Sequence, residues 1–308
     1  MKLPTVSVIM NCYNSEAFLR EAIESVIAQT LTNWEIIFWD NCSDDHSAEI
    51  ANSYRDERIR YFKAERHSNL GGARKLAVEH SRGQFLAFLD CDDLFLPDTL
   101  ETQLRAIESH TAAVVYGGMT AIDRQGRELF YRSPNCQSGN VFDDNLRQYD
   151  APMATIMIRR SVLIEEQLNF DPEIFGSEEY DLLMHLAVSH DFAVVHRSIA
   201  KMRLSRNSLT YEVMDKWATD RERTLDHIRE RHPGIERSHR NGFKQAYARA
   251  NYYRARWHVE EQRTGEALTE LRQVMFVDYR YFSLYLILNL SPGLWKWIHN
   301  RRASSRNF

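Results

Sequence analysis

Over the first 120 residues, short apolar runs alternate with segments in which apolar residues recur every three to four positions. The runs are rich in β-branched and aromatic residues, which predicts strands at residues 6–10, 35–39, 59–62, 85–89 and 112–116. The periodic segments predict helices at residues 15–29, 47–54 and 73–79, and from Pro97 towards His110. This alternation predicts an α/β fold with a mainly parallel, twisted sheet flanked by helices.

The chain is less regular between residues 121 and 210, and it is almost wholly helical afterwards. Residues 133–149 are predicted as a loop, residues 154–158 and 192–195 as strands, and residues 178–189 as a helix. Helical periodicity then predicts helices at residues 213–231, 240–262, 265–277 and 283–290. We therefore predict one α/β domain over residues 1–210, in two parts at 1–120 and 121–210, and a C-terminal helical region over residues 211–308.

Composition and charge limit the classes of protein to which this chain can belong. Of the 308 residues, 44% are hydrophobic and 27% are charged, as in an ordinary folded protein, and the net charge of −4 argues against a nucleic-acid binder. Residues 211–308 carry 18 Lys+Arg against 12 Asp+Glu, which leaves 21 Lys+Arg against 31 Asp+Glu in residues 1–210. The first 210 residues are therefore acidic and suit a divalent cation, whereas the basic C-terminal region suits an anionic surface. Four cysteines without a CxxC spacing are typical of reduced thiols in the cytoplasm.

Polar residues follow three of the predicted strands and should gather at one edge of the sheet. They are Asn11, Tyr13, Asp40 and the acidic segment 90–93. The carboxylates of Asp90, Asp92 and Asp93 repel one another, and a hard cation such as Mn²⁺ or Mg²⁺ would stabilise them by sharing their oxygens. The alternative is a solvated acidic loop with no metal.

Three other residues at this edge suit a nucleotide. Asp40 can accept a hydrogen bond from a base or a ribose hydroxyl, and Tyr13 can stack on a base, although both also suit ordinary turns. Arg74 follows a Gly71–Gly72 turn that could bring its guanidinium to a phosphate, or it is an exposed arginine at a helix start. The spacing of the glycines matches neither GxGxxG nor a P-loop.

Two later segments carry candidate chemistry. Glu178 and Glu179 open a predicted helix, where acidic residues favour the positive end of the helix dipole; a glutamate there could also serve as a general base. Arg203 and Arg206 could hold phosphates or lie on a surface loop.

Taken together, these motifs resemble the family 2 glycosyltransferases of the GT-A fold, which is Rossmann-like. The resemblance rests on the following segments: VSVIMNCYN (6–14), AQT (28–30), WEIIFWD (34–40), NLGGAR (69–74), GQFLAFLDCDD (83–93) and LPD (96–98). It is dense over residues 1–120, thinner over 121–210, and offers little beyond 210. It implies that residues 1–120 bind a nucleotide-sugar and that residues 121–210 form the acceptor half.

The resemblance also implies roles for single residues. Asn11, Tyr13 and Asp40 would line the nucleoside pocket, Asp90 would approach the ribose, and Arg74 would help with the phosphates. Asp92, with Asp90 beside it, would ligate Mn²⁺ or Mg²⁺. The acidic pair of the family falls on Glu178 and Glu179, with Glu179 as the base and Glu178 next.

This chain departs from the family pattern at four positions. The second acidic residue is Glu179 where Asp is common, and His185, Ser205 and Lys75 stand where Arg, His and Asn are usual. These changes bear on the acceptor side more than on donor binding.

The resemblance implies an inverting, metal-assisted transfer from a UDP-sugar to a hydroxyl, in bacterial cell-surface glycan synthesis. The alternatives are a nucleotidyltransferase on a related fold and a non-catalytic scaffold. An apolar and aromatic segment, 281–290 with Trp295 and Trp297, precedes Arg301, Arg302 and Arg306. It predicts either a packed helix or contact with the inner face of the cell membrane. That contact would suit a cytoplasmic enzyme with a lipid-linked glycan acceptor; the oligomeric state is left open.

Overall fold

The computed structural model describes residues 3–204 and 213–303, and the side chains up to residue 299. The chain forms two compact units. The first unit comprises Met1–Val141, Asp150–Glu173 and Leu186–Ser205, and the second comprises Phe142–Tyr149, Ile174–His185 and Arg206–Phe308. Ser205, Arg206 and Arg306, which the sequence analysis singled out, lie outside the described residues.

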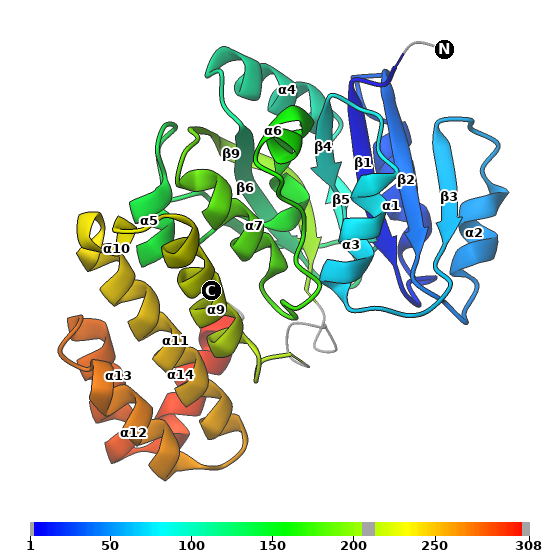
Figure 1. Ribbon diagram of the computed structural model, residues 1–308. Coiled ribbons are helices and arrows are strands. Elements are labelled where there is room, and N and C mark those ends of the chain that lie inside the picture. The colour runs from blue at the N-terminus through cyan, green and yellow to red at the C-terminus, as the bar shows by residue number, and fades with distance from the viewer. Residues whose placement is uncertain (1–2, 205–212, 304–308) are drawn as a thin grey trace. The chain divides into compact units, whose positions relative to one another are not determined.

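The first unit is built on one sheet of nine strands within the described residues, in the order β3-β2-β1-β4-β8-β6-β9-β5, with β7 paired to β6 (Figure 1). The strands are β1 Val6–Cys12, β2 Trp34–Asp40, β3 Ile59–Lys63, β4 Phe85–Phe88, β5 Leu94–Phe95, β6 Val114–Ile122, β7 Glu128–Arg132, β8 Met157–Arg159 and β9 Phe192–Arg203. The helices are α1 Leu19–Ile27, α2 Ser47–Ser53, α3 Leu70–Glu79, α4 Thr99–Ser109 and α6 Arg160–Glu165, with a 3₁₀ turn, η1, at Met153–Thr155.

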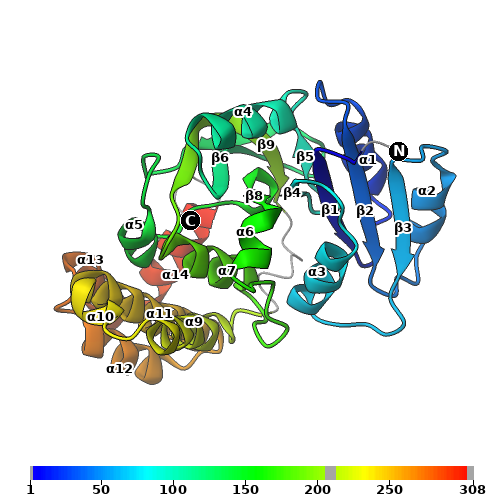
Figure 2. The same cartoon turned by 45° about the horizontal axis from the view of Figure 1, so that its top comes forward.

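Strands β3, β2, β1 and β4 are parallel and lie side by side (Figure 2). The chain leaves β1 towards β2 and β3 and then returns to the other side of β1 as β4, so the sheet reverses its order at β1 and β4. Ligands of open α/β sheets bind outside the carboxyl ends of the strands at such a point. The fold therefore brings the residues after β1, β2 and β4 to the place where a ligand is expected.

Burial explains why these segments form strands and helices. Alternate residues of β1, namely Val6, Val8 and Met10, are buried in one cluster with four residues of α1 spaced three to four apart: Leu19, Ala22, Ile23 and Val26. Helix α3 packs on β1 and β2. Because β1 and β2 are covered on both faces, they read as continuous apolar runs rather than as alternating ones.

The predicted alternation over residues 1–120 is confirmed, but one detail there and two details further along the chain are wrong. Helix α3 begins at Leu70, so Gly71 and Gly72 lie in its first turn and do not form a separate turn. The Oδ1 of Asn69 accepts a hydrogen bond from the Gly72 N–H at 2.9 Å, and a Cβ at Gly72 would lie 3.0 Å from that oxygen, so glycine allows the cap. The loop predicted over 133–149 contains helix α5, and the strand predicted over 154–158 is divided between η1 and β8.

The second unit is helical. Its elements are α5 Phe142–Arg147, α7 Glu178–Ala187 (up to His185), α9 Trp217–Arg231, α10 Ile235–Ser238, α11 Arg240–Glu260, α12 Thr264–Val274, α13 Tyr279–Leu290 and α14 Pro292–Ala303. Helix α11 packs against α9, α12 and α5. At the α5 contact a Cβ on Gly242 would lie 2.7 Å from Leu146, so glycine allows the close approach. Among the described residues, none of the helices has both the length and the apolar character that crossing a membrane requires.

Candidate active site

Asp40 lies at the carboxyl end of β2, paired in register with Cys12 at the end of β1. Its side chain is fully buried. One carboxylate oxygen accepts a hydrogen bond from the Ser43 N–H at 2.8 Å, and the other accepts from the Tyr61 hydroxyl at 2.6 Å. Burial, and then the hydrogen bond to Asp40, raise the pKa of Tyr61. Tyr61 therefore stays a donor and holds the carboxylate in one orientation.

The end of β1 presents an amide and an aromatic ring. The Nδ2 of Asn11 is buried and has no hydrogen-bond partner among the described residues, so its N–H groups can donate to a ligand. Tyr13 is 51% exposed, and its ring lies 4.4 Å from that of His67, centroid to centroid. The Nδ1 of His67 lies 3.0 Å from the carbonyl oxygen of Asn41, which fixes this second ring. The two aromatic rings therefore contact each other near the carboxyl ends of β1 and β2.

The acidic segment after β4 holds three carboxylates in different surroundings. Asp90 pairs with Arg74 at 2.8 Å, and the Arg74 side chain is only 4% exposed. Burial, and then the charge of Asp90, raise the pKa of Asp92 to about 6. Burial, and then the charge of Asp92, raise the pKa of Asp93 well above its usual value, and its Oδ1 accepts a hydrogen bond from the Arg203 N–H. The segment is thus a crowded, partly buried set of oxygens rather than a solvated loop.

Arg203, the last residue of β9, is a structural anchor for this segment. All three guanidinium nitrogens donate within the protein: to the carbonyl oxygens of Asp92, Asp123 and Arg124, and to the Glu21 carboxylate. The guanidinium also lies 4.1 Å from the centre of the Phe18 ring. Both interpretations offered for Arg203, a phosphate ligand and a surface residue, are disfavoured, because its side chain is buried and four of its five N–H groups donate within the protein.

Replacing Arg203 with Met is expected to lower the free energy of unfolding by about 2–4 kcal/mol, because several buried acceptors lose their donors. Urea unfolding followed by tryptophan fluorescence measures this. Arg197→Met is the control: Arg197 is 47% exposed in its pair with Asp98, and a loss below about 1 kcal/mol is expected there. Equal losses in the two variants would contradict the anchoring role.

The acidic pair lies in the second unit, at the start of α7. Glu178 is buried, whereas Glu179 is partly exposed. The loop before the pair is fixed by Asp220 of α9, whose Oδ2 accepts hydrogen bonds from the N–H groups of Phe175 and Gly176 at 3.1 and 2.8 Å. Burial raises the pKa of Asp220. The sequence offered no signal for this residue, which holds the loop immediately before α7.

The predicted donor residues therefore fall in the first unit, where Asn11, Tyr13 and Asp40 end neighbouring strands and Arg74 meets Asp90. Asp92 follows in the same acidic segment. Glu178 and Glu179 fall in the second unit. The sequence analysis missed three residues that hold the first group in place: Tyr61, His67 and the anchoring side chain of Arg203.

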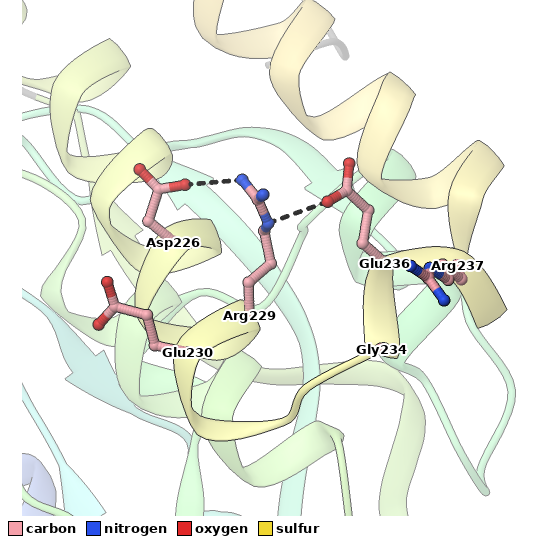
Figure 3. A pocket seen from close by; sticks show the side chains of 6 residues that line it. All are labelled: Asp226, Arg229, Glu230, Gly234, Glu236 and Arg237. Atoms are coloured by element: carbon pink, nitrogen blue, oxygen red, sulfur yellow. Dashed lines mark hydrogen bonds and ion pairs between the residues drawn. The ribbon is translucent and has the colours of Figure 1, made fainter.

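A surface pocket in the second unit is lined by Asp226, Arg229, Glu230, Gly234, Glu236 and Arg237 (Figure 3). Arg229 lies between two carboxylates, 3.2 Å from Asp226 and 2.9 Å from Glu236. The charged groups at its centre therefore pair with one another, and we assign no chemistry to this pocket.

Comparison with known sequences matches this chain to glycosyltransferases. Residues 7–166 match the sequence profile of glycosyl transferase family 2. An uncharacterized glycosyltransferase of Rickettsia felis is 31% identical over 214 residues, which are 69% of this chain but only 35% of that protein. A Bacillus subtilis protein, TuaG, whose name provisionally assigns it to teichuronic acid biosynthesis, is 30% identical over 70% of this chain and 83% of its own length.

Two further proteins carry more specific names. The Escherichia coli protein WfgD, named a UDP-Glc:α-D-GlcNAc-diphosphoundecaprenol β-1,3-glucosyltransferase, is 27% identical over 67% of this chain and 79% of its own. The structure of Staphylococcus aureus TarS 1–349 in complex with UDP-GlcNAc covers 91% of this chain and 90% of its own, with a TM-score of 0.59 and 19% identity. The likeness to TarS confirms the predicted GT-A fold.

Proposed function

This chain belongs to glycosyl transferase family 2, and from that premise we propose that it transfers a sugar from a UDP-sugar to a hydroxyl of a cell-surface glycan, with inversion at the anomeric carbon. The observation that carries the proposal is the group of polar residues at the carboxyl ends of β1, β2 and β4. A nucleotide donor is supported by the family itself, and uridine is the nucleoside in the names of WfgD and of the TarS complex.

The nucleoside part of the donor fits the first unit. The exposed ring of Tyr13 offers a stacking surface, which His67 supports from one side. Asp40 uses one lone pair on each oxygen for Ser43 and Tyr61, and a carboxylate has further acceptor sites for a base N–H. The buried Nδ2 of Asn11 can donate to a carbonyl of the base. Asp90, held by Arg74, is the carboxylate that we assign to the ribose.

A divalent cation fits the acidic segment. Three carboxylates within four residues are partly buried, and their mutual repulsion contributes to the raised pKa values of Asp92 and Asp93. Oxygen ligands of this kind suit Mn²⁺ or Mg²⁺. We propose that Asp92 holds the cation with Asp90 beside it; a cation bound there supplies positive charge to the diphosphate leaving group. Arg74 stands next to Asp90 and adds a fixed positive charge.

We propose Glu179 as the base. Glu179 removes the proton of the acceptor hydroxyl as that oxygen attacks the anomeric carbon from the face opposite the leaving diphosphate. Glu179 is preferred over Glu178 because its side chain is partly exposed and Glu178 is buried. A single displacement of this kind inverts the anomeric configuration and needs no covalent intermediate.

Product analysis tests this function against its main alternative. Incubation with UDP-sugars, Mn²⁺ and simple glycoside acceptors is expected to release UDP, and proton NMR of the product is expected to show the inverted anomer. Release of pyrophosphate in place of UDP would support a nucleotidyltransferase. Release of neither, with a full panel of nucleotide-sugars, would support a scaffold.

We also propose that α13 and α14 contact an anionic membrane surface, which suits a lipid-linked acceptor. Four side chains on one face of α13 are exposed: Tyr279 by 79%, Phe282 by 41%, Leu286 by 40% and Leu290 by 80%. The opposite face, with Leu284 and Leu288, is buried in the core of the unit. Arg301 and Arg302 belong to α14 and Arg306 follows it in the sequence, and these positive charges complement anionic lipid.

Replacing both Leu286 and Leu290 with Glu is expected to weaken binding to phosphatidylglycerol vesicles about tenfold, through lost apolar burial and added negative charge. Vesicle co-sedimentation measures this. Thr269→Glu, an exposed position on α12, is the control. Equal binding by the wild type and the double variant would contradict the membrane contact.

A further inference from the structure

A group of side chains of the types that bind metals lies in the helical unit and contains no residue of the proposed donor or base sites. Asp181 and His185 are one turn apart on α7 and so lie on the same face of the helix. His227 belongs to α9. One carboxylate oxygen of Asp181 and one ring nitrogen of each histidine all lie within 4.8 Å of one another. The separation between the His185 Nε2 and the Asp181 Oδ1 is 3.8 Å.

We propose that Asp181, His185 and His227 form a zinc site that fastens α7 to α9. Two imidazoles and one carboxylate are a common zinc donor set, with a fourth position left for water. Ligand atoms around tetrahedral zinc lie roughly 3.4 Å apart, given bonds of about 2.0–2.1 Å. The three atoms therefore need to approach by about an ångström, which side-chain rotation allows.

The surroundings of the three residues favour a built site over a chance surface cluster. The side chains of Asp181 and His185 are only 6% and 9% exposed. Thr224, one turn before His227 on α9, is fully buried, and its hydroxyl donates to the Asp181 Oδ1 at 2.8 Å. Hydrogen bonds of this kind orient carboxylate ligands and raise metal affinity. The Arg221 guanidinium of α9 stacks over the Tyr180 ring, 4.0 Å from its centroid.

The donor chemistry separates this site from the acidic segment of the first unit. Imidazole nitrogen favours Zn²⁺ over Mg²⁺, whereas the all-carboxylate set near Asp92 favours the harder ions. Zinc here would act on α7 by fixing its second turn to α9. Asp220 of the same α9 already holds the loop before Glu178. The two contacts would together set the direction of the helix that begins with the acidic pair.

Titration of the full chain with Zn²⁺ alone, after chelation and dialysis, tests the proposal. The wild type is expected to bind one Zn²⁺ per chain by calorimetry, with a rise in thermal unfolding temperature that Mg²⁺ does not cause. Asp92→Ala is expected to bind equally, which separates this site from the acidic segment. His227→Gln is expected to lose about 100-fold in affinity, and Thr224→Val about tenfold. His110→Gln, an exposed histidine of the first unit, is the matched control.

Two results would overturn the site. One is equal Zn²⁺ affinity in the wild type and in His227→Gln, which would place the ion elsewhere. The other is no binding by the wild type at micromolar Zn²⁺, which would leave Asp181 and His185 as an ordinary ion pair. Should His227→Gln fail to fold, Co²⁺ titrated into the wild type decides the matter. A visible absorption band of a four- or five-coordinate nitrogen and oxygen site is expected, and its absence contradicts the proposal.

Discussion

Glu179→Gln is expected to lower kcat by about 10³-fold while leaving the Kd for the nucleotide-sugar within a factor of about two. The amide keeps the size and the hydrogen-bonding capacity of the side chain but cannot accept the proton of the acceptor hydroxyl. Initial rates of UDP release measure kcat, and calorimetry with the donor alone measures the Kd. A loss confined to kcat identifies a group that acts in the chemical step rather than in donor binding.

Two neighbouring substitutions sharpen this result. Glu178→Gln is expected to affect stability more than kcat, because Glu178 is buried. Glu173→Gln, an exposed glutamate close in sequence, is expected to leave both unchanged. If Glu178→Gln lost the activity and Glu179→Gln kept it, the base would move by one residue. Full activity in both variants would remove the acidic pair from the mechanism.

The periodicity of the sequence predicts the first half of the sheet well, and there is a physical reason. Strands β1, β2 and β4 are covered on both faces, so nearly every side chain is apolar and the runs stand out. The predicted boundaries of helices and strands are wrong where tertiary contacts override the local secondary-structure preference of the sequence. Helix α5 is only six residues long, and Gly242 and Phe243 of α11, about a hundred residues later, pack against it. No pattern within residues 133–149 can report that contact.

The residues of the candidate site also fall into those that the sequence can predict and those that it cannot. The positions of residues that end or follow strands, such as Asp40 and Asp92, can be predicted from sequence because the fold class fixes which edge of the sheet they reach. Residues that hold them are found only in three dimensions. Tyr61 belongs to β3 and reaches Asp40 by strand pairing, and Arg203 reaches the acidic segment from more than a hundred residues away. A hydrogen bond between residues far apart in the sequence cannot be predicted from the local spacing of residue types.

Asp92→Ala is expected to abolish the Mn²⁺-dependent part of UDP binding, weakening the Kd in Mn²⁺ by about 100-fold or more. The expectation follows from removing the carboxylate that we place closest to the cation, since a diphosphate near Asp90 and Asp93 without a cation meets carboxylates whose negative charge Arg74 offsets only in part. Calorimetric titration with UDP, GDP and CDP, each with and without Mn²⁺, measures the effect and the base preference together.

The variant is expected to stay folded, because the side chain that it loses lies among like charges and its burial opposes ionisation. A circular dichroism melting curve establishes this before binding is measured. Asp98→Ala is the matched control: Asp98 is 46% exposed, pairs with Arg197 in the same stretch of chain, and has no proposed contact with the donor. UDP affinity in Mn²⁺ that is the same in the wild type and in Asp92→Ala would exclude Asp92 as the ligand. Because Asp90 already pairs with Arg74, and Asp93 is buried and accepts a hydrogen bond from the Arg203 N–H, a metal-independent transfer relying on Arg74 would then replace the metal-assisted one.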